Sequence, residues 1–239
     1  MRKRKRLAGG LLAACVLCMA GAAGGAPAAP APRDALAAGA VDGVALEEWT
    51  ARWWQWAESQ WIAPYRDPDG RLCALGQSGP VWFLAGTDGT FDALRTCTIP
   101  ADVHVLVPVI NTMQSVRSRG GKADCAGLQA GAAVNNDRLV SAVVLLDGRS
   151  LGDIRGHRVR TPACFRLGRH EAAPLAASDG YWLMLAPLPR GRHRLMVGAN
   201  YGAPDSPYGR MQQHFEYVLD VGGPILVSEA GGPPRGRTQ

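Results

Sequence analysis

After its first six residues the sequence contains no block of lysine and arginine, and this absence excludes a class of partners. Residues 2–6 supply five of the 26 basic residues, so 21 remain beyond residue 22, where they face 20 acidic residues for a net charge of +1. A nearly neutral chain lacks the basic surface with which proteins bind nucleic acid. The sequence therefore predicts no nucleic-acid partner.

The sequence also lacks the short motifs of nucleophilic, nucleotide and zinc chemistry. It has no G-x-S-x-G elbow, because the serine in Gly76-Gln77-Ser78-Gly79 is wrongly spaced, and it has neither a P-loop nor a dinucleotide-binding glycine pattern. Beyond residue 22 there is no Cys-x-x-Cys pair. The histidines form no His-x-His or His-x-x-x-His pair, so a zinc site is disfavoured; they are His104, His157, His170, His193 and His214.

The N-terminal segment has the layout of an export signal. A basic start is followed by an apolar stretch, Leu7–Met19, and by the small residues Ala20-Gly21-Ala22, so residues 1–22 are predicted to be a cleaved signal peptide. The apolar stretch is too short for a membrane span. Leu12-Ala13-Ala14-Cys15 also resembles a lipobox, and the alternative is therefore a lipid anchor on Cys15.

Composition divides the rest of the chain into three parts. Residues 23–43 are dominated by Ala, Pro and Gly, and are predicted to be a disordered linker. Residues 44–228 form the predicted single domain, and residues 229–239 a flexible tail. The chain is long enough for one globular domain of this size.

The four cysteines beyond residue 22 are an even number, which suits disulfides in an oxidising compartment. Four cysteines allow three pairings. We favour Cys73 with Cys97 and Cys125 with Cys164, because each pair closes a moderate loop between neighbouring strands.

One helix is clearly indicated, at about residues 46–61. Leu46, Trp49, Trp53 and Trp56 recur at helical spacing and predict one apolar face, which is expected to be buried, and Pro64 ends the pattern. Beyond the helix the sequence changes to short runs of β-branched and aromatic residues between turn signals such as Asp179-Gly180.

These runs predict a mainly β fold, an antiparallel β-sandwich (jelly-roll-like), with the Trp-rich helix packed on or beside it. The Gly- and Ala-rich residues 112–137 are expected to be a long loop. The predicted strands are 81–85, 103–110, 139–146, 159–167, 182–185, 193–198, 214–221 and 225–228.

Several stretches resemble a group of uncharacterised secreted bacterial proteins. The similarity spans residues 44–222 and is most distinctive in the run from Cys73 to Gly86, in Arg95-Thr96-Cys97-Thr98-Ile99-Pro100, and in Val107-Pro108-Val109-Ile110-Asn111. The resemblance implies an exported β-rich domain and no particular activity. It also implies a lysine at position 102, where this chain has Asp102.

Four aromatic residues are the candidate ligand contacts. Trp54 and Trp61 lie off the apolar face of the predicted helix, whereas Tyr201 and Tyr208 lie in a Gly- and Pro-rich segment after a strand. Exposed aromatic side chains of this kind stack on sugars or contact proteins.

The acidic residues offer two further candidate sites. Asp67 and Asp69 lie in one turn, and Asp88 and Asp92 in the next acidic loop, so their carboxylates are candidate calcium ligands. Glu58 and Glu216 are candidate acids of a glycosidase, which needs two carboxylates converging in a cleft.

From these features we expect an exported, non-enzymatic binding or envelope-associated domain with a glycan or protein partner. The alternative is an extracytoplasmic hydrolase that acts on envelope carbohydrate, with Glu58 or Glu216 as the acid. The sequence does not identify the ligand.

Overall fold

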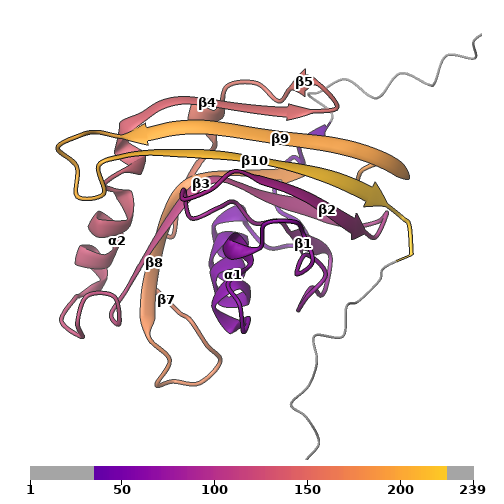
Figure 1. Cartoon of the computed structure of the whole chain (residues 1–239). Coiled ribbons are helices and arrows are strands. Elements are labelled where there is room, and N and C mark those ends of the chain that lie inside the picture. Colours follow the sequence, from indigo (N-terminus) through magenta and orange to yellow (C-terminus); the bar gives the residue numbers. More distant parts are fainter. Residues whose placement is uncertain (1–34, 225–239) are drawn as a thin grey trace, which may run out of the picture.

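The chain forms two five-stranded sheets that share a hydrophobic core (Figure 1). The structure is a computed structural model that describes residues 35–224. Sheet I has the order β1-β3-β8-β6, with β7 also paired to β8, and sheet II has the order β2-β10-β9-β4-β5. The strands are β1 (Val81–Phe83), β2 (Ala93–Ile99), β3 (His104–Ser115), β4 (Leu139–Leu146), β5 (Arg149–Ser150), β6 (Arg158–Arg160), β7 (Phe165–Arg166), β8 (Leu175–Leu185), β9 (Gly191–Gly202) and β10 (Arg210–Val221).

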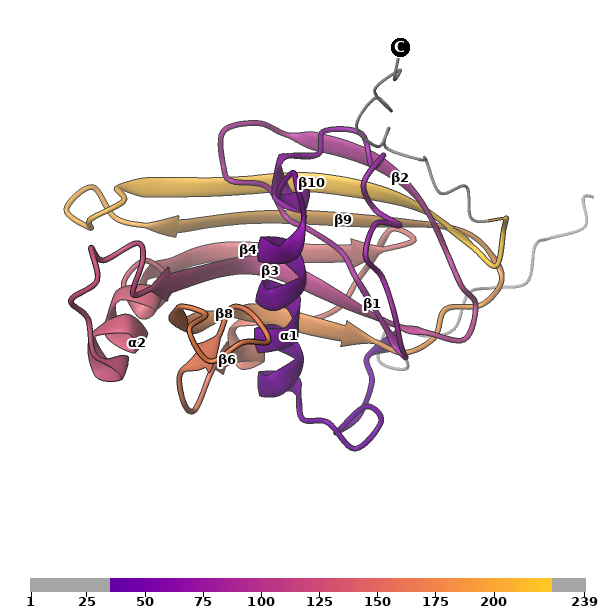
Figure 2. The same cartoon turned by 90° about the horizontal axis from the view of Figure 1, so that it is seen from below.

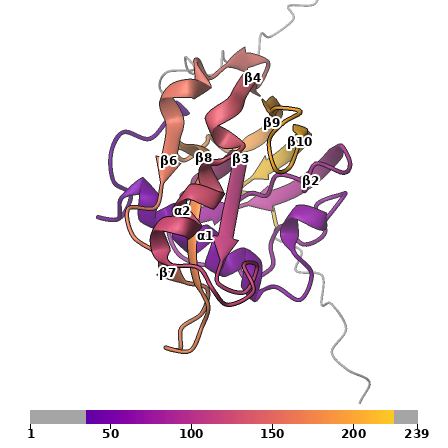
Figure 3. The same cartoon turned by 90° about the vertical axis from the view of Figure 1, so that its left-hand side faces the viewer.

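The mainly β prediction is confirmed, but the strands are not all antiparallel. β1 pairs with β3 in parallel, and β2 pairs with β10 in parallel, both at sheet edges. Parallel neighbours need a crossover connection, and between β1 and β3 the chain crosses to sheet II to form β2 (Figure 2). There β2 lies beside β10 (Figure 3). The sheets are therefore mixed and not closed, and the jelly-roll-like sandwich stays a prediction.

Helix α1 (Leu46–Ser59) confirms the predicted Trp-rich helix and covers the outer face of sheet I (Figure 2). Glu47 and Glu48 lie in its first turn, where the helix dipole favours carboxylates. The helix ends where Gln60 adopts an extended conformation. Its buried side chains form a second apolar cluster with sheet I, which includes Trp49, Trp53, Trp54, Trp56, Phe83, Leu106, Trp182 and Met184.

The residues just before α1 are packed onto sheet I, although composition predicted a linker as far as residue 43. Ala37 N–H donates to the Met184 carbonyl, and Leu36 forms a bridge with Leu185. Backbone pairing with the end of β8 gives these residues a structure that their Ala- and Gly-rich composition does not signal. The predicted signal peptide, Cys15, residues 23–34, the strand at 225–228 and the tail lie outside the described residues.

The predicted long loop at residues 112–137 is wrong for most of its length. β3 continues to Ser115, and the chain then forms helix α2 (Cys125–Ala133) and the 3₁₀ turn η3 (Asn136–Arg138). Asp124 is the N-cap of α2, and its carboxylate accepts a hydrogen bond from Gly127 N–H at 2.8 Å. The cap supplies a helix start that Gly- and Ala-rich residues do not signal by periodicity.

Asp179-Gly180 resembles a turn in sequence but lies in the middle of β8. The Asp179 side chain is 2% exposed and is held by Arg158 and Arg160 of the neighbouring β6 segment, at 2.9 and 2.7 Å. Gly180 pairs with Asn111 of β3. The strand accommodates Asp179 because two arginines neutralise its carboxylate. Position 180 requires glycine because the neighbouring atoms leave no room for a side chain.

Gly180 gives a direct test of this packing. A Cβ atom at position 180 would lie 2.6 Å from the Ile110 carbonyl oxygen and 2.7 Å from Trp182 Nε1, so we expect Gly180→Ala to lower the free energy of unfolding by about 1–3 kcal/mol. The matched control is Gly198→Ala in β9, where nothing lies within 4 Å of the added atom. Equal urea midpoints for the two variants would contradict the prediction.

Both predicted disulfides are present. Cys73 is bonded to Cys97, and Cys125 to Cys164, with Cα–Cα distances of 5.9 and 5.7 Å. The first bridge ties the loop after α1 to β2, and the second ties α2 to the segment before β7. Among residues 35–224, no helix is long and apolar enough to cross a membrane.

Candidate functional site

A β-bulge in β3 decides which of its residues face α1. Before the bulge Val107 faces the core between the sheets, and Leu106 faces the α1 cluster. The pairing with β8 shifts by one residue between Pro108 and Ile110, and the alternation of side chains shifts with it. Ile110 therefore lies in the core between the sheets. Met113 packs against the α1 cluster, and Asn111, two residues before it, lies on the same face of the strand.

A cleft of about 310 Å³ opens on this side of the bulge; we call it the α1 cleft. It lies between α1, the end of β3 and the ends of β9 and β10, so both sheets contribute to it. Its lining residues are Trp53, Trp54, Glu58, Tyr65, Gly86, Thr87, Asp88, Asn111, Thr112, Met113, Gln114, Tyr201, Tyr208, Met211 and Gln213.

The inner wall of the α1 cleft is aromatic and rigidly held. Trp53 Nε1 donates to the Leu84 carbonyl at 2.6 Å, and Trp54 Nε1 donates to Ser178 Oγ at 2.8 Å. The two indoles meet edge to face. Both indole N–H groups are satisfied inside the protein, so this wall is fixed and presents ring carbon to the cleft.

The outer rim carries tyrosines that reach toward solvent. Tyr208 is 49% exposed, and its hydroxyl accepts a hydrogen bond from Gln114 Nε2 at 2.5 Å. Tyr65 is partly buried, and its burial, followed by the nearby charge of Glu58, raises the pKa of its hydroxyl. The Tyr65 phenol therefore stays neutral at physiological pH, and both tyrosine hydroxyls act as hydrogen-bonding groups.

Some polar side chains in the cleft already form hydrogen bonds within the protein, and one does not. Gln213 Oε1 accepts a hydrogen bond from Thr87 N–H at 3.3 Å. Burial raises the pKa of Tyr201, and a hydrogen bond from Gln213 opposes this shift. Asn111 is different, since its buried Nδ2 has no partner among the described residues. A buried N–H group without a partner is costly, so Asn111 Nδ2 is the candidate hydrogen-bond donor to a ligand in the cleft.

The charge of the α1 cleft is negative. Glu58 and Asp88 line it, and of the described residues in its walls none is Lys, Arg or His. Arg66 lies outside the lining and approaches Asp88 at 3.9 Å, which partly offsets that carboxylate. Such a cleft favours an uncharged or cationic ligand over an anionic one.

The four aromatic residues predicted to contact ligand fall into two pairs. Trp54 and Tyr201 line the cleft but are only 8% and 4% exposed, so neither is a free platform. Trp54 is buried by β8, and Tyr201 because β9 continues through it to Gly202. Tyr208 and Trp61 are exposed, at 49% and 97%, and Tyr208 lines the cleft.

The four candidate calcium ligands are not gathered into one site. The Asp67 carboxylate accepts hydrogen bonds from backbone N–H groups of its own turn, and Asp69 pairs with Arg71 at 2.7 Å. Asp88 bonds Thr90 within its loop, while Asp92 lies 3.6 Å from His214. Within residues 35–224 no group of three or more His, Cys, Asp or Glu side chains could hold a metal ion.

The two candidate catalytic carboxylates occupy different places. Glu58 lines the α1 cleft, whereas Glu216 lies near His214 and forms a diagonal ion pair with Arg194 of β9. Glu216 is not among the cleft residues. Asp88, predicted as a calcium ligand, is the carboxylate that shares the cleft with Glu58.

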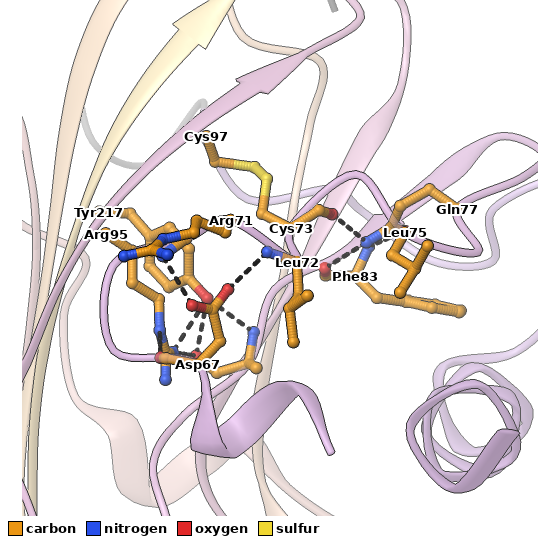
Figure 4. The surroundings of a disulfide bond; sticks show 12 residues. Asp67, Arg71, Leu72, Cys73, Leu75, Gln77, Phe83, Arg95, Cys97 and Tyr217 are labelled. Atoms are coloured by element: carbon orange, nitrogen blue, oxygen red, sulfur yellow. Dashed lines mark hydrogen bonds between the residues drawn. A yellow bond between two sulfur atoms is a disulfide. The ribbon is translucent and has the colours of Figure 1, made fainter. Parts of the chain in front are cut away.

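A buried arginine holds the segment behind one wall of the cleft; Figure 4 shows it beside Asp67 and Tyr217. Arg95 of β2 is 1% exposed. Its Nε donates to the Asp67 carbonyl at 2.6 Å, and its Nη1 donates to the carbonyls of Ala85 and Gly86 and to the Tyr217 hydroxyl at 2.5, 2.9 and 3.0 Å. Gly86 lines the cleft, so Arg95 fixes the segment that forms one of its walls.

Sequence reasoning did not single out Asn111, Gln114 or Gln213, the amide groups of the cleft. Asn111 belongs to a stretch that carries the resemblance, but nothing in its spacing predicts the bulge that turns it toward α1. Gln213 extends the alternation of β10, where an inward polar residue between apolar ones was the available signal.

Comparison with known proteins adds no functional information. No family model and no curated protein matches the sequence. A solved structure, the solution structure of amebosin, is 8% identical, with 54% of this chain and 95% of that chain covered and a TM-score of 0.17. A TM-score of this size carries no argument about the fold.

Proposed function

We propose that this protein is an exported binding domain that holds an uncharged sugar unit of an envelope glycan in the α1 cleft. One observation carries the proposal: aromatic walls, tyrosine hydroxyls and an amide nitrogen without a partner, Asn111 Nδ2, converge on one cleft. Sugar rings present both apolar faces and hydroxyl groups, which such a lining can recognise. The predicted signal peptide and the two disulfides support export.

Asn111 provides the test of this proposal. We expect Asn111→Ala to weaken glycan binding about five- to tenfold, which corresponds to one lost hydrogen bond. The melting temperature should not fall, because Asn111 Nδ2 bonds nothing in the protein. Isothermal titration of the full oxidised chain with β-1,4-linked N-acetylglucosamine and glucose oligomers measures the affinity.

The matched control is Asn200→Ala. Asn200 is exposed on β9, donates to Ser141 Oγ, and does not line the cleft, so this variant should bind as the wild type does. Wild-type binding that Asn111→Ala leaves unchanged would contradict the assignment of the site. Absence of any glycan binding would contradict the proposed function itself.

A second candidate function is glycan hydrolysis, favoured by one observation. Glu58 and Asp88 both line the α1 cleft, and a glycosidase needs two carboxylates around its substrate. Release of reducing ends from the same oligomers, abolished in Glu58→Gln, would establish turnover. Binding without release supports the binding domain.

A further inference from the structure

Trp61 is exposed to a degree that is unusual for tryptophan. Its side chain is 97% exposed, the highest value among the exposed large hydrophobic residues of the described chain. It follows Glu58 by three residues and precedes Tyr65 by four, and both of those residues line the α1 cleft. An indole in this position is available to a ligand that extends beyond the cleft.

The segment that carries Trp61 is short and held at both ends. On one side, Gln60 Nε2 donates to the Trp56 carbonyl at 3.1 Å, at the end of α1. On the other side, Pro64 begins the 3₁₀ turn η2 (Pro64–Arg66) and is buried. Three residues of extended chain span at most about 11 Å, so the Trp61 Cα lies within that distance of the Glu58 Cα.

The α1 cleft itself is small. Its volume of about 310 Å³ is at the lower end of the range for small-molecule sites. Tyr208, 49% exposed, stands on its β9–β10 side, whereas Trp61 follows the end of α1. A ligand of several rings would therefore leave the cleft and meet an exposed aromatic face on the α1 side.

We propose that Trp61 is an outer stacking position for a further sugar ring, and that the ligand is an oligosaccharide chain rather than a single sugar. This inference rests on the proposed function. The alternative occupant, an anionic membrane, is less well matched, because the arginines that follow Trp61 in the sequence each lie close to a carboxylate: Arg66 approaches Asp88, and Arg71 pairs with Asp69. Stacking on a neutral ring needs no free cation.

The test is a length series. β-1,4-linked N-acetylglucosamine oligomers of one to six units are titrated into the full oxidised chain, and wild-type affinity should rise with length. We expect Trp61→Ala to weaken binding of the longest oligomers about fivefold, as for the loss of one stacking contact, and to leave the monosaccharide affinity unchanged. Trp61→Phe should retain most of the affinity.

The controls separate the inference from the function on which it rests. Leu94→Ala removes another exposed apolar side chain, 63% exposed and outside the cleft, and should have no effect. Oligomer binding that is independent of length, or unchanged in Trp61→Ala, overturns the inference alone. Binding to anionic phospholipid vesicles that Trp61→Ala abolishes assigns Trp61 to a membrane and also overturns it. No binding of any oligomer overturns both proposals.

Discussion

Replacing Arg95 with methionine should lower the free energy of unfolding by about 3–5 kcal/mol. The substitution keeps the apolar stem but removes the donors to the carbonyls of Asp67, Ala85 and Gly86. Each buried acceptor left without a partner costs about 1–3 kcal/mol. Urea unfolding of the full oxidised chain, followed by tryptophan fluorescence, measures the change.

The size of this effect depends on burial, and a second arginine shows the contrast. Arg194 pairs with Glu216, but its side chain is 63% exposed, and an exposed pair contributes about 0–1 kcal/mol. Arg194→Met should therefore lie within 1 kcal/mol of wild type, and Arg95→Lys, which keeps a cation but loses the guanidinium fork, should lie between the two. An Arg95→Met protein as stable as Arg194→Met would refute the bracing role.

Arg95 also explains why one strand was missed in the sequence. β2 reads ALRTCTI, and its inward residues are Ala93, Arg95, Cys97 and Ile99. A charged residue at an inward position interrupts the alternation that predicts a half-buried strand. Only the folded chain shows that carbonyls from two other segments and a tyrosine hydroxyl surround the guanidinium.

Local patterns succeeded where the determining contacts are close in sequence. The three- and four-residue spacing of Trp49, Trp53 and Trp56 predicts α1, and the apolar run 139–146 coincides with β4. The cysteine pairs were likewise predicted from moderate loop lengths. For the helix and the strand, the signal and the structure involve the same short stretch of chain.

Long-range relations could not be predicted in the same way. The parallel pairing of β2 with β10 joins Ala93 to Phe215, and no turn between them specifies its direction. The α1 cleft depends on the same kind of relation, because Glu58, Asn111 and Gln213 come from three distant segments. The sequence contained the right residue types, but their convergence follows from strand order and from the bulge in β3.

The Cys73–Cys97 disulfide links stability to the α1 cleft. It closes a 24-residue separation, and in the chain-entropy description its loss destabilises the protein by about 3.5 kcal/mol. The loop it fixes also holds α1, because Trp56 Nε1 donates to the Leu75 carbonyl at 2.9 Å. Loosening this loop therefore affects the helix that forms one side of the cleft.

The second disulfide is the natural comparison. Cys125–Cys164 closes a longer separation of 39 residues, so chain entropy alone predicts a slightly larger loss, about 4 kcal/mol, when it is removed. Neither of its cysteines lines the cleft. The two bridges should thus be similar in their effect on stability and different in their effect on binding.

We therefore expect Cys73→Ala/Cys97→Ala to lose about 3–4 kcal/mol of unfolding free energy and also to bind glycan oligomers more weakly under conditions where the protein remains folded. Cys125→Ala/Cys164→Ala should lose comparable stability and keep wild-type affinity. Urea unfolding and isothermal titration on both double variants give the two quantities. Equal losses of affinity would mean that global stability, rather than the loop held by Cys73, governs the cleft.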